Sequence, residues 1–279
     1  MSASFPQIFD RKLYLARQQK ARSAHAPLLA HVAEDLADRL AVINHQFASA
    51  LVIALAPSPF CAVLKATDKF SSIATMAPPP SDHLELGAVE HDAIFSLLDL
   101  HCVNDVPGYL AQCAKALKPD GLFMASAFAG DTLLELRNAW AAAESDVLGE
   151  ISPRVAPMIG VREMGGLLQR AGLALPVTDS NRLTLRYADA LALLHEVKAF
   201  GFGNPLQERR KNFTSRRVLA GLLQNYEQNN ADADGRVRAT LDLLWAMAWK
   251  PHESQPKPKK PGSATMRFED ALKKLDNEN

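Results

Sequence analysis

The spacing of apolar residues along the chain predicts alternating helices and strands. From Leu28 to Ile43 they recur every three or four positions, which is typical of a helix with one buried face. The run 51–55 is short and continuously apolar, and it predicts a strand. Runs at 91–98 and 122–128 are almost entirely apolar, as expected of strands buried on both faces of a parallel sheet.

Strands that alternate with helices predict an α/β fold, with a parallel sheet covered by helices on both faces. A weak strand is expected at 71–76 and a short one at 84–86. The segment 237–249 could be a strand or a helix by its pattern alone. We expect the following divisions: a helical N-terminal extension at 1–48, an α/β core at 49–187, a helical insertion at 188–236, the last strand at 237–249 and a Pro/Lys-rich tail at 250–279.

The turn after the first predicted strand lacks glycine. In a doubly wound sheet this turn is where a nucleotide cofactor lies. Glycine lets the backbone approach such a ligand closely, because it has no Cβ atom. Residues 54–58 read Ala-Leu-Ala-Pro-Ser, and the first glycine of the chain is Gly87. The sequence therefore predicts the fold of a cofactor-binding protein without the glycine-containing turn that usually contacts the cofactor.

Composition narrows the possible partners. The 279 residues carry 31 Lys plus Arg and 31 Asp plus Glu, so no overall charge draws the chain to nucleic acid or to a membrane surface. The three cysteines have no metal-ligand spacing, and buried thiols in a reducing compartment are expected. No apolar run reaches the roughly 20 residues that span a bilayer, and none resembles a signal peptide. We expect a cytoplasmic protein without a membrane span and without a metal site.

Basic residues gather in two segments. The first lies in the predicted helix at 10–23, where a solvated face is expected and a lid or docking segment is the alternative. The second lies in the predicted insertion, where few aromatic residues interleave it. Nucleic-acid binding is therefore not expected, and a solvated face or an acidic protein partner is favoured. The two sets are Arg11, Lys12, Arg17, Lys20 and Arg22, and Arg209, Arg210, Lys211, Arg216 and Arg217.

Polar residues follow the predicted strands at the edge of the sheet where ligands bind. His101 is either a substrate contact or proton acceptor near pH 7, or a packing residue. Asp131 is a second catalytic candidate, with helix capping as its alternative. Candidate substrate contacts, each with a structural alternative as a cap, ion pair or loop tether, are Asn104, Asp105, Arg137 and Arg154. Candidate cofactor contacts at the same edge are Ala54, Ala56, Ser58, Ser96, Leu97 and Asp99.

Several segments resemble the class I S-adenosylmethionine (SAM)-dependent methyltransferase superfamily. The closer resemblance is to the branch that holds the biotin-pathway carrier-protein methyltransferases and the mitochondrial complex I assembly factor described as a protein-arginine hydroxylase. The assembly-factor side matches better, mostly through Gly130–Arg137 and the C-terminal segment. The segments that carry the resemblance are Ile8–Arg11, His91–Asp105, Leu117–Gly121, Gly130–Arg137, Ile151–Pro157, Trp249–Gln255 and Gly262–Ala264.

The resemblance implies a Rossmann-like sheet of seven mostly parallel strands and a SAM cofactor. Two departures affect that cofactor: the family's Asp-x-Gly-x-Gly turn is replaced at 54–58, and 74–78 lacks the acidic residue that takes the ribose hydroxyls. Each lost charge-assisted hydrogen bond costs about 1.5–3 kcal/mol. Two such losses weaken binding by roughly a hundredfold to ten-thousandfold.

Three functions follow from the resemblance. The first is a methyltransferase-family protein with a degraded SAM site, a pseudoenzyme most like the complex I assembly factor. It acts with or without hydroxylase activity, and its partner is a protein substrate or a complex I subunit. The second is an active SAM-dependent methyltransferase on a protein or carrier-bound substrate. The third is a non-catalytic protein-binding module. The glycine-free turn at 54–58 favours the first or the third.

Overall fold

The computed structural model of the chain describes residues 6–21, 26–256 and 262. Six strands form one sheet in the order β2-β1-β3-β4-β6-β5, in which β2, β1, β3 and β4 are parallel. β6 pairs antiparallel with both β4 and β5. The strands are β1 Phe47–Ile53, β2 Phe70–Met76, β3 His91–Leu97, β4 Leu117–Phe128, β5 Ala174–Tyr187 and β6 Val237–Trp249.

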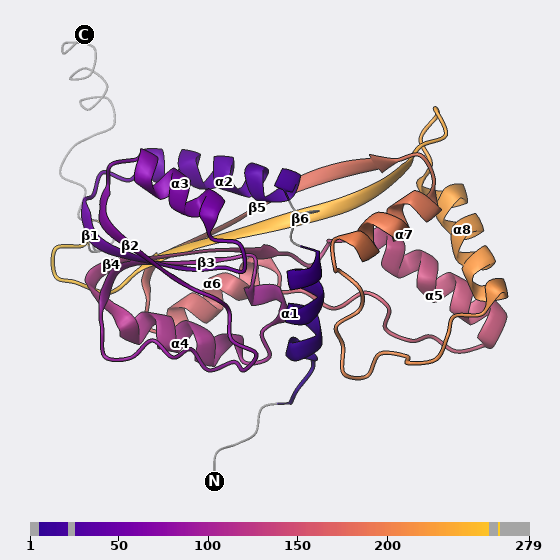
Figure 1. Cartoon of the computed structure of the whole chain (residues 1–279), viewed down its shortest axis with the longest axis horizontal. Coiled ribbons are helices and arrows are strands. Elements are labelled where there is room, and N and C mark those ends of the chain that lie inside the picture. The colour runs from indigo at the N-terminus through magenta and orange to yellow at the C-terminus, as the bar shows by residue number, and fades with distance from the viewer. Residues whose placement is uncertain (1–5, 22–25, 257–261, 263–279) are drawn as a thin grey trace.

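Helices cover both faces of this sheet, and three more gather at the far ends of β5 and β6 (Figure 1). One face lies under α2 and α3, the other under α4 and α6, while α5, α7 and α8 form the group at the far end. The helices are α1 Arg11–Lys20, α2 Ala26–Ala41, α3 Ser58–Ala66, the 3-10 turn η1 Leu100–Cys102, α4 Val106–Ala116, α5 Leu134–Leu148, α6 Val161–Arg170, α7 Ala190–Ala199 and α8 Arg216–Asn230.

The apolar stripe predicted between Leu28 and Ile43 forms the buried face of α2. Val32, Leu36 and Leu40 have no exposed surface and pack against the sheet. Burying a leucine side chain contributes about 1.5–3 kcal/mol. The helical spacing of these apolar residues therefore reflects the burial of one face of α2 against the sheet.

The mixed α/β class is confirmed, but the expectation of seven strands is wrong for the part of the chain that the structure describes. The missing strand is the one expected at 84–86. The Leu84 backbone N–H donates to Gln112 Oε1 at 2.7 Å, and Gln112 Nε2 donates to the Asp82 carbonyl at 3.1 Å. This segment is thus fastened to α4 and not to a strand, because its backbone groups are satisfied there.

The segment 237–249, whose pattern suited either a strand or a helix, is strand β6. It lies between β4 and β5, and Leu243, Leu244 and Ala248 are fully buried. Pairing on both sides satisfies its backbone, and burial of both faces explains its continuous apolar character. Between β5 and β6 the chain forms α7 and α8, where the helical insertion was predicted.

Three smaller predictions concern cysteines, membranes and the tail. Cys102 and Cys113 are buried free thiols as expected, whereas the free thiol of Cys61 is only half-buried. Among the described helices, none combines the length and the apolar character that crossing a bilayer requires. Most of the tail, at 257–261 and 263–279, lies outside the described residues, and the divisions at 48, 187, 236 and 249 stay predictions.

Matched phenylalanine deletions test the assignment of the core. Phe123 in β4 is fully buried, and Phe213 in the loop before α8 is fully exposed. Phe123→Ala leaves a cavity and is expected to lower the free energy of unfolding by about 3–5 kcal/mol in urea denaturation. Phe213→Ala is expected to change it by less than about 0.5 kcal/mol. Equal effects of the two substitutions would contradict the described core.

Candidate functional site

The carboxyl ends of β1, β3 and β4 meet at one edge of the sheet, where a small cavity lies beside the glycine-free turn. Its walls include Ala54, Leu55 and Ala56 from the turn and Leu97 from the end of β3. Its volume is about 30 Å³. This edge cavity brings together three of the predicted cofactor residues, Ala54, Ala56 and Leu97.

The other predicted cofactor residues lie elsewhere. Ser58 is exposed at the start of α3. Ser96 is fully buried, and its hydroxyl lies 2.8 Å from the Tyr109 hydroxyl. Asp99 is buried just beyond β3, where it faces Arg11.

Arg11 and Asp99 form a buried ion pair that fixes α1 across the sheet edge. An Arg11 guanidinium nitrogen lies 2.7 Å from Asp99 Oδ2, and Arg11 Nε donates to the Pro79 carbonyl at 2.8 Å. Both side chains are almost fully buried. Burial raises the pKa of the Asp99 carboxyl, and the charge of Arg11 opposes that shift. The expectation of a wholly solvated basic face on this helix is therefore wrong at Arg11, since Asp99 compensates its charge.

His101 lies on η1 beside this pair. Its Nε2 is 2.9 Å from the Tyr14 hydroxyl, while its Nδ1 is buried without a hydrogen-bond partner. Burial, and then the positive charge of Arg11, lowers the pKa of His101 to about 3. The ring is therefore neutral and a weak base near pH 7, which disfavours the predicted proton acceptor. A contact role for His101 stays a prediction.

Three further candidates, Asp131, Arg137 and Asp105, make contacts within the protein. Asp131 pairs with Arg182, so the expected cap of α5 is absent; α5 begins after Leu133, whose φ is +55°. Arg137 donates to the Gly130 carbonyl at 3.2 Å. Asp105 caps α4 by accepting from the Gly108 N–H at 2.8 Å.

Asn104 and Arg154 fasten loops. Asn104 Oδ1 accepts from the Phe9 backbone N–H at 2.7 Å. Arg154 donates to the fully buried Glu144 through Nε at 2.7 Å, and its guanidinium lies 4.7 Å from the centre of the Trp140 ring. These contacts give each residue a structural role, and their predicted roles in substrate binding stay predictions.

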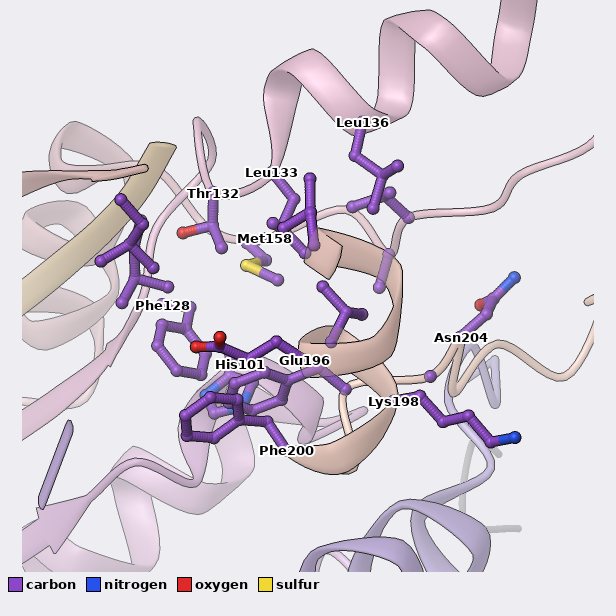
Figure 2. A pocket seen from close by; sticks show the side chains of 18 of the residues that line it. His101, Phe128, Thr132, Leu133, Leu136, Met158, Glu196, Lys198, Phe200 and Asn204 are labelled. Atoms are coloured by element: carbon purple, nitrogen blue, oxygen red, sulfur yellow. The ribbon is translucent and has the colours of Figure 1, made fainter. Parts of the chain in front are cut away.

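A second cavity of about 520 Å³ opens between the sheet edge, α5 and α7 (Figure 2). Leucines and aromatic rings make up most of its wall, and we call it the α7 cavity. It is lined by residues from many separate parts of the chain, among them Tyr14 of α1, Phe128 of β4 and Leu136 of α5. Of the predicted site residues, His101 and Arg154 line it.

The loop that follows α7 holds one end of this cavity against α1. Gly201 has φ +69°, and a Cβ atom there would lie 2.9 Å from the Arg17 carbonyl oxygen. Gln18 Nε2 donates to the Phe200 carbonyl at 3.1 Å, and an Arg17 guanidinium nitrogen donates to the Asn204 carbonyl at 3.0 Å. Glycine is required here because only it combines this φ with so close an approach.

Sequence reasoning missed the cavity residues that α7 contributes. Glu196, Val197 and Lys198 line the cavity, as does Thr132 just before α5. Thr132 is almost completely buried, and its hydroxyl donates to the Asp242 carbonyl at 3.0 Å. The α7 positions lie in no motif, and only the packing of α7 against β5 reveals them, whereas Thr132 lies in the segment Gly130–Arg137 that carries the family resemblance. Within the described residues, no cluster of His, Cys, Asp and Glu is arranged to hold a metal ion.

Comparisons with known proteins identify relatives in sequence and in fold. The human "Arginine-hydroxylase NDUFAF5, mitochondrial" is 32% identical over 295 residues, which cover 97% of this chain and 84% of the human protein. The Danio rerio protein of the same name is 35% identical over 182 residues, or 65% of this chain. A malonyl-[acyl-carrier protein] O-methyltransferase of Xylella fastidiosa is 36% identical over 160 residues, which cover 57% of this chain and 52% of that protein.

The chain matches only part of some relatives, and the names of the relatives bear on its localisation. The chain spans 56% of the length of the Danio rerio relative. No family model matches the chain. The NDUFAF5 relatives are named as mitochondrial, and this finding contradicts the expected cytoplasmic localisation.

A solved structure supports the fold. A Bacillus halodurans protein described as a methyltransferase superposes with a TM-score of 0.50 at 10% identity, covering 78% of this chain and 98% of that one. At this identity the likeness concerns the fold alone, and it agrees with the predicted Rossmann-like methyltransferase sheet.

The low pKa of His101 predicts a pH-dependent stability. The unfolded chain takes up this proton near the ordinary pKa of 6.5, and the folded chain only near pH 3. The free energy of unfolding therefore falls as the pH drops through this window. His101→Phe removes the effect, so between pH 7 and pH 4 its free energy of unfolding should fall by on the order of 3 kcal/mol less than that of the wild type.

Urea unfolding at both pH values measures this difference. His195 is exposed on α7 and serves as the matched position, so His195→Phe should follow the wild type. If His101→Phe lost as much stability as the wild type between pH 7 and pH 4, the description of His101 as a buried, neutral side chain would be wrong.

Proposed function

The chain belongs to the family of the NDUFAF5 arginine hydroxylases, and from this premise we propose that it acts as a complex I assembly factor that binds a protein side chain in the α7 cavity. The contrast between the two cavities carries the proposal. The α7 cavity, at about 520 Å³, falls within the roughly 300–1,000 Å³ of ligand pockets. The edge cavity, at about 30 Å³, is far below that range.

The edge cavity does not fit SAM. Leu28 of α2 and Tyr14 and Gln18 of α1 face the turn at 54–56 across it. The nearby Asp99 carboxylate already pairs with Arg11. The turn at 54–58 also carries Cβ atoms at positions where the fold usually has glycine, whose backbone approaches the cofactor closely. These contacts support a degraded SAM site, in which the protein's own side chains fill the cofactor's place.

An active SAM-dependent methyltransferase is the second candidate function. The malonyl-[acyl-carrier protein] O-methyltransferase relatives favour it, at 36% identity in the example from Xylella fastidiosa. It requires α1 and the start of α2 to move away from the turn, which would break the Arg11–Asp99 pair. Separating such a buried pair costs about 3–5 kcal/mol when one charge is left uncompensated.

Calorimetric titration of the full chain with SAM separates the two functions. We expect no binding heat at SAM concentrations up to about 1 mM, which corresponds to an affinity weaker than about −4 kcal/mol. The Xylella fastidiosa relative, titrated alongside, is the positive control. A dissociation constant below 1 mM for this chain would contradict the degraded site and favour the methyltransferase.

Gene deletion with cavity variants tests the assembly role. Deleting the gene in its source organism should lower the amount of assembled complex I on native gels, and the wild-type gene should restore it. Leu194→Trp, which fills the α7 cavity, should restore less. Leu191→Trp, on the exposed side of α7, is the matched control and should restore fully. Normal complex I in the deletion strain would rule out the assembly role.

A further inference from the structure

Glu196 brings a negative charge into the wall of the α7 cavity. It is half-buried in the middle of α7, and no other carboxylate lines the cavity among the described residues. In Figure 2 its carboxylate points from α7 toward Phe128 and His101, while the Lys198 side chain points away from them. The helix therefore directs one carboxylate into a mostly apolar space.

No cation of the described part of the chain forms an ion pair with this carboxylate. The Arg154 guanidinium is held by Glu144 and lies against Trp140. His101 is neutral because its pKa is lowered to about 3 by burial and by Arg11. Tyr187 hydrogen-bonds to Glu196, and burial together with this carboxylate raises the pKa of Tyr187. Tyr187 thus orients Glu196 without neutralising its charge.

The wall that faces Glu196 consists of aromatic rings in contact. The His101 and Phe128 rings lie 4.6 Å apart, centre to centre, and Phe128 and Phe202 lie 4.9 Å apart. Phe200 stacks on Phe202 at 5.9 Å, and Tyr14 meets His101 edge to face at 5.5 Å. The faces of aromatic rings carry partial negative charge and attract cations. A carboxylate opposite such a wall favours a positively charged group between them.

We propose that the α7 cavity binds a cationic group carried on an apolar or aromatic body, and that Glu196 is the residue that selects the charge. The inference rests on the proposed function, in which this cavity takes a side chain of a protein substrate. Few polar groups fix orientation in an apolar pocket. Here Glu196 binds the charge, and the rings and leucines exclude water around the apolar part.

Matched small ligands test the selection of charge. Benzylammonium and benzyl alcohol differ in charge and scarcely in shape, and each is titrated calorimetrically into the full chain at pH 7. Wild type should bind benzylammonium at least about tenfold more tightly than benzyl alcohol. Glu196→Gln should bind the two equally, through loss of benzylammonium affinity alone. Glu227 is exposed on α8, and the control Glu227→Gln should retain the tenfold preference.

A third ligand makes the test independent of any variant. Benzoate has the same ring and a negative charge, and wild type should bind it more weakly than benzyl alcohol. A preference for benzoate, an unchanged preference for benzylammonium in folded Glu196→Gln, or no binding of any of the three ligands would overturn the proposal. If benzyl alcohol bound as tightly as benzylammonium, the role of Glu196 would be refuted. The proposed assembly role would be unaffected by that result, because the cavity-filling variants test it separately.

Discussion

The buried pair of Arg11 and Asp99 is the constraint on which the carboxyl edge of the sheet depends. Two charges removed from water are tolerated only when each compensates the other and further hydrogen bonds satisfy the remaining groups. Arg11 meets this condition through Asp99 and the Pro79 carbonyl, whereas Asp99 Oδ1 is buried without a hydrogen-bond partner in the described part of the chain. The pair fixes α1 across the ends of the strands. Tyr14, one turn further on the same helix, then becomes part of the wall of both cavities. One ion pair thus holds in place the helix that contributes to the walls of both the small edge cavity and the larger α7 cavity.

The fold could largely be predicted from the sequence because the burial of one face of a helix or strand gives its apolar residues a regular spacing. The face of α2 and the apolar runs of β1, β3 and β4 are read directly from the spacing of their side chains. The expected strand at 84–86 failed for a reason that spacing does not reveal. Leu84 is buried, but its backbone N–H bonds to a side chain of α4. Apolar spacing predicts burial, and it does not specify which group satisfies the backbone.

The candidate site was predicted less completely, because its residues come from separate parts of the chain. His101 and Arg154 were found because they follow predicted strands or lie in a segment that resembles a family motif. Arg11 was expected in water because its partner lies on another element, far away in sequence. Glu196 belongs to a helix whose orientation depends on β5 and on the loop at Gly201. Charge compensation and the direction of a side chain are tertiary properties, and local spacing carries no signal for them.

The position of β6 has a consequence for how the chain reaches its native state. β6 lies between β4 and β5 and pairs along nearly its whole length with β5, and its Trp249 end pairs with Leu122 near the start of the β4 pairing. During synthesis β4 and β5 therefore emerge from the ribosome long before the strand that joins them. Their unpaired edges stay open to other chains in that interval, and contacts so distant in sequence form slowly. Chaperone binding to the nascent chain would be most useful in this interval, before residue 249 has left the exit tunnel.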